Sequence, residues 1–164
     1  MPKITVIAHN IRSTHNIGSI LRTCEGFGVN QLVLSGYSPY PAFKGDSRLP
    51  HIQNKITAQI AKTALGAENM VPFLRSENVF DTIRHYKSQD YTVLGLEQAP
   101  GSVRLQDLAR VPRMVLILGE EVNGIEPGIL ALCDRIVEIP MFGQKESFNV
   151  SVAAGIALYQ LVCK

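Results

Sequence analysis

The stretch RIVEIPMFGQKESFNVSVAAGIALYQL, residues 135–161, combines the patterns of a strand, a loop and a helix. Its first part, RIVEIPM, is a short apolar run typical of a buried strand. The polar loop FGQKES follows, and a helix of small and apolar residues begins near Phe148. A strand that leads through a loop into a helix is the repeating unit of an α/β sheet, so the same alternation is expected earlier in the chain.

The alternation does run through the rest of the sequence. Several apolar runs lack polar alternate residues, as expected of parallel strands covered on both faces. Ser76 and Ser102 are expected helix N-caps, and Pro127 fits a first helical turn. The predicted strands are 3–8, 31–35, 70–74, 91–96, 113–119 and 135–139, and the predicted helices are 16–27, 52–65, 77–88, 105–109, 127–133 and 148–163. The pattern predicts an open, mostly parallel α/β sheet with helices on both faces.

Composition limits the class of protein. The chain has 164 residues, of which 46% are hydrophobic and 18% charged, and this predicts a single domain, residues 1–164. No apolar run approaches the ~20 residues that cross a bilayer, and no signal peptide is visible, so a cytoplasmic protein is expected. Three separated cysteines and four histidines without ligand spacing indicate neither a disulfide framework nor a metal site.

The loop after the first strand is a candidate site, because ligands of open α/β sheets bind outside the carboxyl ends of the strands. On the following helix, Arg22 shares a face with Gly18, one turn earlier. Helical side chains lean toward the N-terminus, so Arg22 is expected to reach over the opening at Gly18. With Arg12 and Asn16 nearby, the exposed N–H groups of the first turn could hold a phosphate. A surface arginine without a role fits this stretch equally well.

The longest irregular segment, residues 36–50, combines aromatic and basic side chains. Long loops in compact domains are usually functional or disordered. These side chains could stack on RNA bases and neutralise the strand, or the aromatic rings could pin the loop to the core. The side chains are Tyr37, Tyr40, Phe43, Lys44 and Arg48.

The last helix bears on assembly. It is apolar nearly all round, and a single sheet domain of this size can hardly bury a terminal helix completely. Gly155, one turn after Ser151, permits close backbone approach. We therefore expect part of this helix to form a homodimer interface.

Three blocks in order resemble the motifs of one family. They are NIRSTHNIGSILRTCEGFG (10–28), LILGEEVNGI (116–125) and IPMFGQKESFNVSVAAGIALY (139–159). The set is similar to the SpoU/TrmH branch of the SPOUT superfamily, whose members are S-adenosyl-L-methionine (AdoMet)-dependent RNA ribose 2′-O-methyltransferases. The resemblance implies a C-terminal deep trefoil knot, an AdoMet site made by the knot loops, a homodimer, and tRNA or rRNA as substrate. A non-catalytic RNA-binding or ribosome-assembly module on the same fold is the alternative.

The resemblance also implies roles for individual residues. Arg22 matches the family's catalytic arginine, and the other positions matching catalytic residues are Asn16, Glu121, Ser147 and Asn149. The positions expected to bind AdoMet are Leu96, Glu97, Gly119, Ile139, Met141, Ser147 and Phe148. The residues expected to contact RNA are Arg12, Lys44, Arg48 and Lys55.

Overall fold

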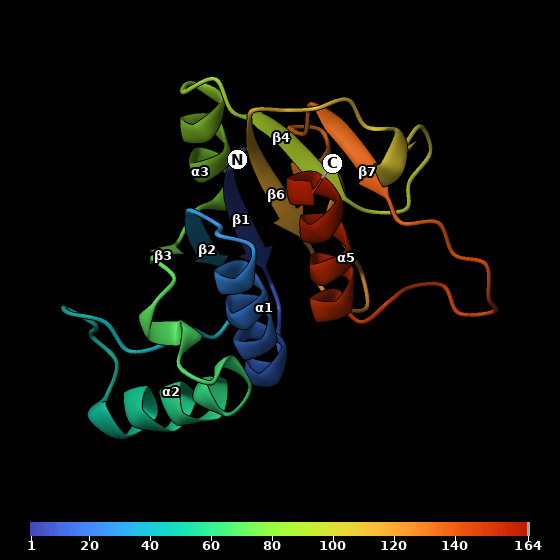
Figure 1. Ribbon diagram of the computed structural model, residues 1–164. Helices are drawn as coiled ribbons and strands as arrows, with labels where there is room; N and C mark the ends of the chain where they lie inside the picture. Colours follow the sequence, from blue (N-terminus) through green and yellow to red (C-terminus); the bar gives the residue numbers. More distant parts are fainter. Residues whose placement is uncertain (164) are drawn as a thin grey trace.

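The computed structural model describes residues 1–163 and contains one parallel sheet of seven strands in the order β3-β2-β1-β6-β4-β7-β5 (Figure 1). The strands are β1 (Lys3–His9), β2 (Gln31–Ser35), β3 (Phe73–Ser76), β4 (Thr92–Leu96), β5 (Val103–Arg104), β6 (Arg113–Leu118) and β7 (Arg135–Glu138). The helices are α1 (Thr14–Gly26), α2 (Pro50–Ala64), α3 (Val79–Lys87), α4 (Pro127–Leu130) and α5 (Val150–Cys163), with short 3-10 turns η1 (Ala67–Asn69) and η2 (Leu105–Asp107). The predicted α/β class is confirmed.

Helices cover both faces of the sheet, as predicted, and each face has its own core. Successive side chains of a strand point to opposite faces, so Val6 and Ala8 of β1 lie in one core and Ile7 lies in the other. The first core is completed by buried residues of α1, α2 and α5, and the second by buried residues of α3 and α4. Figure 1 shows α1 and α5 side by side on the same face.

Three details of the sequence prediction are wrong. The third strand begins at Phe73 rather than residue 70, because Pro72 has no N–H to donate and its carbonyl accepts the Leu32 N–H at the start of the pairing. The two-residue β5 was not predicted, since so short an apolar run carries no periodic signal. Ser76 and Ser102 are not N-caps; Asn78 caps α3 by accepting hydrogen bonds from two backbone N–H groups, and Ser102 directly precedes β5. Pro127 does lie in the first turn of α4.

Gly18 lies where α1 and α2 pack closely against each other. A Cβ atom built on Gly18 would lie 2.1 Å from Thr63 Oγ1 and 2.3 Å from the Ile60 carbonyl oxygen. The Thr63 hydroxyl also donates to the His15 carbonyl at 2.8 Å. The predicted opening above Gly18 is therefore absent, because the backbone of α2 fills it.

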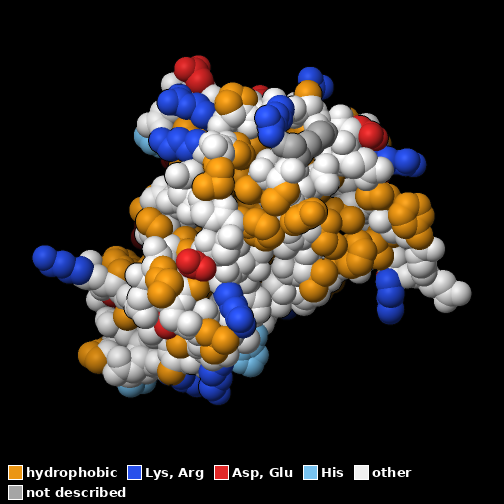
Figure 2. Space-filling model, in the orientation of Figure 1, with side chains coloured by type: hydrophobic (Ala, Val, Ile, Leu, Met, Phe, Trp, Pro, Cys, Tyr) orange, Lys and Arg blue, Asp and Glu red, His pale blue; other side chains and the backbone are white. Residues whose placement is uncertain are grey.

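The last helix is covered on one side only. Val150, Ala154 and Leu158 are buried, whereas Ile156 and Tyr159 are exposed by 37% and 61%. Figure 2 shows hydrophobic side chains gathered over the region where α5 lies in Figure 1. The expectation that the protein chain alone cannot bury this helix is confirmed. Within residues 1–163, no helix is long and apolar enough to cross a membrane.

Candidate functional site

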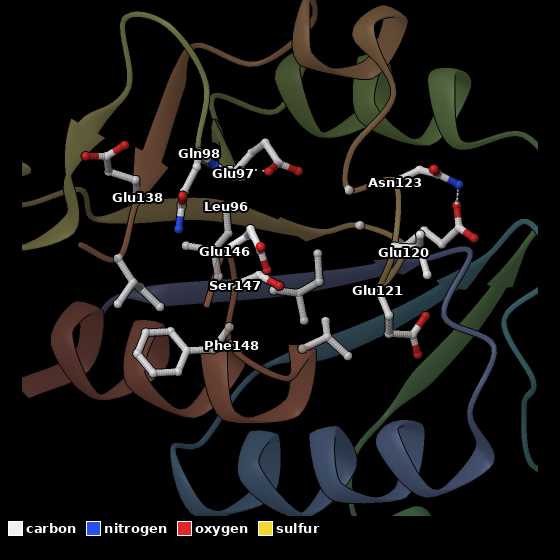
Figure 3. A pocket seen from close by; sticks show the side chains of 17 residues that line it. Leu96, Glu97, Gln98, Glu120, Glu121, Asn123, Glu138, Glu146, Ser147 and Phe148 are labelled. Carbon is white, nitrogen blue, oxygen red and sulfur yellow. Dashed lines mark hydrogen bonds between the residues drawn. The ribbon is translucent and has the colours of Figure 1, made fainter. Parts of the chain in front are cut away.

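A cavity of about 360 Å³ lies at the carboxyl ends of β4, β6 and β7 (Figure 3). Loops that follow these strands form its walls, together with the segment that leads into α5. The lining residues are Leu96, Glu97, Gln98, Leu118, Gly119, Glu120, Glu121, Val122, Asn123, Gly124, Glu138, Ile139, Glu146, Ser147, Phe148, Val150 and Ala153. The volume falls within the range of small-molecule sites.

Three residues from three separate sequence motifs join beside this cavity. The Asn16 amide Nδ2 donates to Glu121 Oε1 at 3.0 Å, and the Asn149 Nδ2 donates to Asn16 Oδ1 at 3.2 Å. Figure 3 shows Glu121 pointing from the loop after β6 toward α1. The hydrogen bonds thus link the loop after β6, the first turn of α1 and the entrance of α5, as the resemblance leads one to expect of one site.

Helix capping fixes two members of this network. Ser13 accepts a hydrogen bond from the Asn16 backbone N–H and so caps α1, which sets Asn16 in the first turn. Asn149 Oδ1 accepts from the backbone N–H of Ser151 at 2.9 Å and from its hydroxyl at 2.6 Å. The Asn149 side chain therefore binds the start of α5 through its oxygen and Asn16 through its nitrogen.

A tight turn shapes the cavity wall after β6. Glu120 and Gly124 form a bridge, and a Cβ atom on Gly119 would lie 2.5 Å from the Gly124 carbonyl carbon. Gly124 itself has φ +69°, a left-handed conformation that favours glycine. The Glu97 carboxylate accepts the Ile125 N–H at 2.8 Å, so this side chain holds the turn in place.

The cavity is strongly acidic. Five glutamates line it, and no lysine or arginine is among its lining residues: Glu97, Glu120, Glu121, Glu138 and Glu146. A hydrogen bond from Asn123, followed by contributions from Tyr37 and Arg12, holds the pKa of Glu120 below its usual value. Such a site favours a cationic ligand over an anionic one.

The predicted cofactor residues converge on this cavity with one exception. Six of the seven line it, while Met141 lies further along the loop and is not a lining residue. Sequence reasoning did not select four further lining residues with polar side chains, namely Gln98, Asn123, Glu138 and Glu146. These four residues lie close to predicted residues in the sequence, and that proximity was the signal that could have identified them.

Four other predicted residues are not among the lining residues of the cavity: Arg22, Lys44, Arg48 and Lys55. Arg22 is exposed on α1, outside the lining and outside the Asn16 network. Arg48 binds Asp46 through its guanidinium and stacks on Tyr40 with 3.7 Å between guanidinium carbon and ring centroid. Lys44 and Lys55 are exposed to solvent.

Two of the aromatic residues pin the loop of residues 36–50. The rings of Tyr40 and Phe43 lie 6.0 Å apart, and Phe43 contacts Phe73 of β3 at 6.3 Å. Tyr37 is half-exposed and lies instead beside Arg12. Within residues 1–163, no group of three or more His, Cys, Asp or Glu side chains is arranged to hold a metal ion.

Solved structures share this α/β fold, a parallel sheet with helices on both faces. A TrmH/SpoU tRNA-modifying enzyme from Aquifex aeolicus matches with a TM-score of 0.81 at 24% identity, over 99% of this chain and 75% of that one. An AdoMet-bound rRNA methyltransferase from Sinorhizobium meliloti matches with a TM-score of 0.80 at 23% identity, over 97% of this chain and 55% of that one. At these identities the likeness establishes the fold.

The chain belongs to the SpoU rRNA Methylase family, whose model matches residues 3–159. It is 31% identical over 161 residues to the 23S rRNA (guanosine-2'-O-)-methyltransferase RlmB of Bordetella pertussis, which covers 98% of this chain but only 60% of that relative. It is 27% identical to the tRNA (guanosine(18)-2'-O)-methyltransferase of Aquifex aeolicus, over 96% of this chain and 67% of the relative. Membership of the family implies the trefoil knot that the resemblance led us to expect.

Proposed function

We propose that residues 1–164 form a catalytic domain that transfers a methyl group from AdoMet to a ribose 2′-hydroxyl of tRNA or rRNA. The observation that carries the proposal is the hydrogen-bonded network of Glu121, Asn16 and Asn149 beside an acidic cavity. The names of the relatives, which act on 23S rRNA and tRNA, support the same reaction and substrates.

The cavity suits AdoMet in charge and size. AdoMet carries a sulfonium and an ammonium against one carboxylate, and the five lining glutamates complement that net positive charge. When bound, AdoMet supplies an electrophilic methyl group on its sulfonium. The six expected cofactor residues that line the cavity would hold it: Leu96, Glu97, Gly119, Ile139, Ser147 and Phe148. Of these, Gly119 allows the backbone of Gly124 to approach closely, which shapes the cavity wall.

The chain's own residues would position the ribose. A 2′-hydroxyl is a weak nucleophile that must lose its proton as it attacks, so orientation counts for several kcal/mol. Glu121 and Asn149, both fixed by Asn16, would hold the hydroxyl, with Ser147 beside the methyl donor. Arginine stays protonated, so Arg22 would fix the neighbouring phosphate and stabilise developing charge rather than remove the proton.

We also propose that the protein is a cytoplasmic homodimer. Exposed apolar residues follow helical spacing on α5, namely Val152, Ile156 and Tyr159. Phe27, which follows α1, packs edge-on against Tyr159 at 6.4 Å, and a Cβ atom on Gly155 would lie 3.8 Å from Cγ2 of Thr23. Arg22 is adjacent to these α1 residues, which supports a place for it at the border of the proposed interface. The RNA would be held by Arg12, Lys44, Arg48 and Lys55.

The variant Ile156→Asp is expected to be monomeric at concentrations where the wild type is dimeric. An unpaired charge buried in an apolar interface costs about 3–5 kcal/mol, so the dimer dissociation constant should rise more than about 100-fold. Light scattering at micromolar protein measures this, with Ala58→Asp on the exposed side of α2 as the matched charge control. A monomeric wild type would contradict the proposed dimer.

The variant Phe148→Ala is expected to weaken AdoMet binding by between about 5-fold and 150-fold. Stacking of a base on an aromatic ring contributes roughly 1–3 kcal/mol, and Phe148 is the aromatic residue in the cavity wall. Titration calorimetry measures the change. Phe142, in the same loop but 92% exposed and outside the cavity, provides the control Phe142→Ala, for which the affinity should not change. Equal losses in both variants would show that the ring does not contact the adenine.

Methyl transfer to RNA tests the function directly. The protein is incubated with methyl-labelled AdoMet and separate tRNA and rRNA fractions, and the RNA is then hydrolysed in alkali. A methylated 2′-oxygen cannot attack its phosphate, so the label should appear in alkali-resistant dinucleotides. RNA binding without AdoMet binding or transfer would instead indicate the non-catalytic module.

A further inference from the structure

A cluster of four side chains joins the loops after β1, β2 and β6, and is called here the Arg12 cluster: Arg12, Tyr37, Glu120 and Asn123. Arg12 Nη2 lies 3.0 Å from Glu120 Oε1, and its guanidinium carbon lies 5.7 Å from the centroid of the Tyr37 ring. The Asn123 amide donates to Glu120 Oε2 at 2.7 Å. In Figure 3 the Glu120 side chain points toward Asn123 and away from Ser147 and Phe148.

The two charged members of the cluster differ in exposure. The Glu120 side chain is 11% exposed, whereas the Arg12 side chain is 70% exposed. Glu120 is therefore fixed between its partners, while much of the guanidinium faces solvent. A free arginine at this position would be a general anion site, but here a fixed carboxylate already neutralises its charge.

The Arg12 cluster borders the candidate catalytic network. The Arg12 backbone N–H donates to Glu121 Oε2 at 3.4 Å, and the other oxygen of Glu121 accepts from Asn16. RNA whose ribose lies at this network would bring a phosphodiester close to the guanidinium. Arginine binds phosphate and carboxylate in the same fork geometry, so the phosphate and Glu120 would compete for the same N–H groups.

We propose that Glu120 is a built-in competitor of RNA phosphate for Arg12, and that this competition sets the affinity and selectivity of the RNA site. The inference rests on the proposed function, because it takes RNA as the ligand. RNA that aligns a phosphate with Arg12 exchanges one ion pair for another. RNA that cannot do so gains nothing from Arg12 and is repelled by Glu120.

The test compares binding of a fluorescent single-stranded oligouridylate by the wild type, Glu120→Gln, Arg12→Ala and the double variant across a salt series. Glutamine keeps an oxygen to accept the Asn123 hydrogen bond and removes the charge. Each phosphate contact to a single strand steepens the plot of log affinity against log salt by about 0.7. Glu120→Gln should therefore add about 0.7 to that slope and bind about fivefold more tightly at 0.1 M salt.

The other variants distinguish competition for Arg12 from a general effect of protein charge on RNA binding. Arg12→Ala in the wild type should weaken RNA binding, because it removes a contact to RNA and leaves the Glu120 carboxylate without its partner. In the Glu120→Gln background, Arg12→Ala should remove the whole gain. Glu126→Gln loses the same charge near His9 instead of Arg12, and should not reproduce the change in slope. Thermal melting checks that each variant is folded.

Two results would overturn the inference: no gain in Glu120→Gln, or a gain that persists in the double variant. The proposed function is judged separately, by methyl transfer of the wild type. Transfer without the gain rejects the competition alone, while the gain without transfer rejects the enzyme and leaves the competition for RNA in place.

Discussion

Methyl transfer by Arg22→Ala is expected to fall by about 10²–10³-fold, while the affinity for AdoMet stays unchanged. Loss of one group that stabilises developing charge in a transition state has an effect of this size. Arg22 lies outside the cavity lining, so its removal should leave the AdoMet site intact. Single-turnover transfer and calorimetry on the same preparation measure the two quantities.

The control for this variant is Arg84→Ala. Arg84 is an exposed arginine that pairs with Asp81, and both belong to α3, which covers the face of the sheet opposite to α1. It removes the same charge and should leave transfer nearly unchanged. If Arg22→Ala abolished AdoMet binding as well, the proposed position of Arg22 relative to the cavity would be wrong. If transfer were retained, the residue would be an ordinary surface arginine.

The variant Gly18→Ala is expected to lower the free energy of unfolding by about 3 kcal/mol, the upper part of the usual range for overpacking. A methyl group at Gly18 would meet the Ile60 carbonyl, which belongs to the backbone of α2 and cannot rotate away. The helices α1 and α2 would have to move apart, which would expose part of the hydrophobic core between them. In a domain of this size the melting temperature should fall by roughly 6–12 °C.

Gly26→Ala in the same helix is the matched control. A Cβ atom at Gly26 would have no neighbour within 4 Å, so the substitution should stabilise the helix by up to about 1 kcal/mol. Equal stability of Gly18→Ala and the wild type would mean that α2 can shift without cost. Opposite signs for the two variants would establish that the close approach, and not helix propensity, requires glycine at residue 18.

The sequence determined the class of fold because its signals are local. The apolar runs that became β1, β2 and β6 each span only a few residues, and each prediction needed only that short window. Local signals did not predict where β3 begins, and they did not predict β5. Both lie toward the edges of the sheet, where pairing with a neighbour, and not the run itself, decides where a strand begins.

The site depended on long-range contacts. Asn149 and Asn16 are 133 residues apart, and only the family resemblance brought them together before the structure did. The prediction of an opening above Gly18 was wrong because it also depended on a long-range contact. The sequence of α1 does not indicate that α2 packs against Gly18. The pairing of Glu120 with Arg12 could not be deduced from their spacing in the sequence.

The central position of β1 has a consequence for how the protein is made. Lys3 of β1 pairs with Arg113 of β6, so the middle of the sheet joins segments more than one hundred residues apart. During synthesis, β1 and β2 leave the ribosome well before β6. The edge of β1 that pairs with β6 therefore stays unpaired until β6 has been made. Such non-local pairing slows folding and favours association with other chains in the interval. The nascent chain is therefore most vulnerable to aggregation after α1 and β2 have emerged and before residue 118 is available.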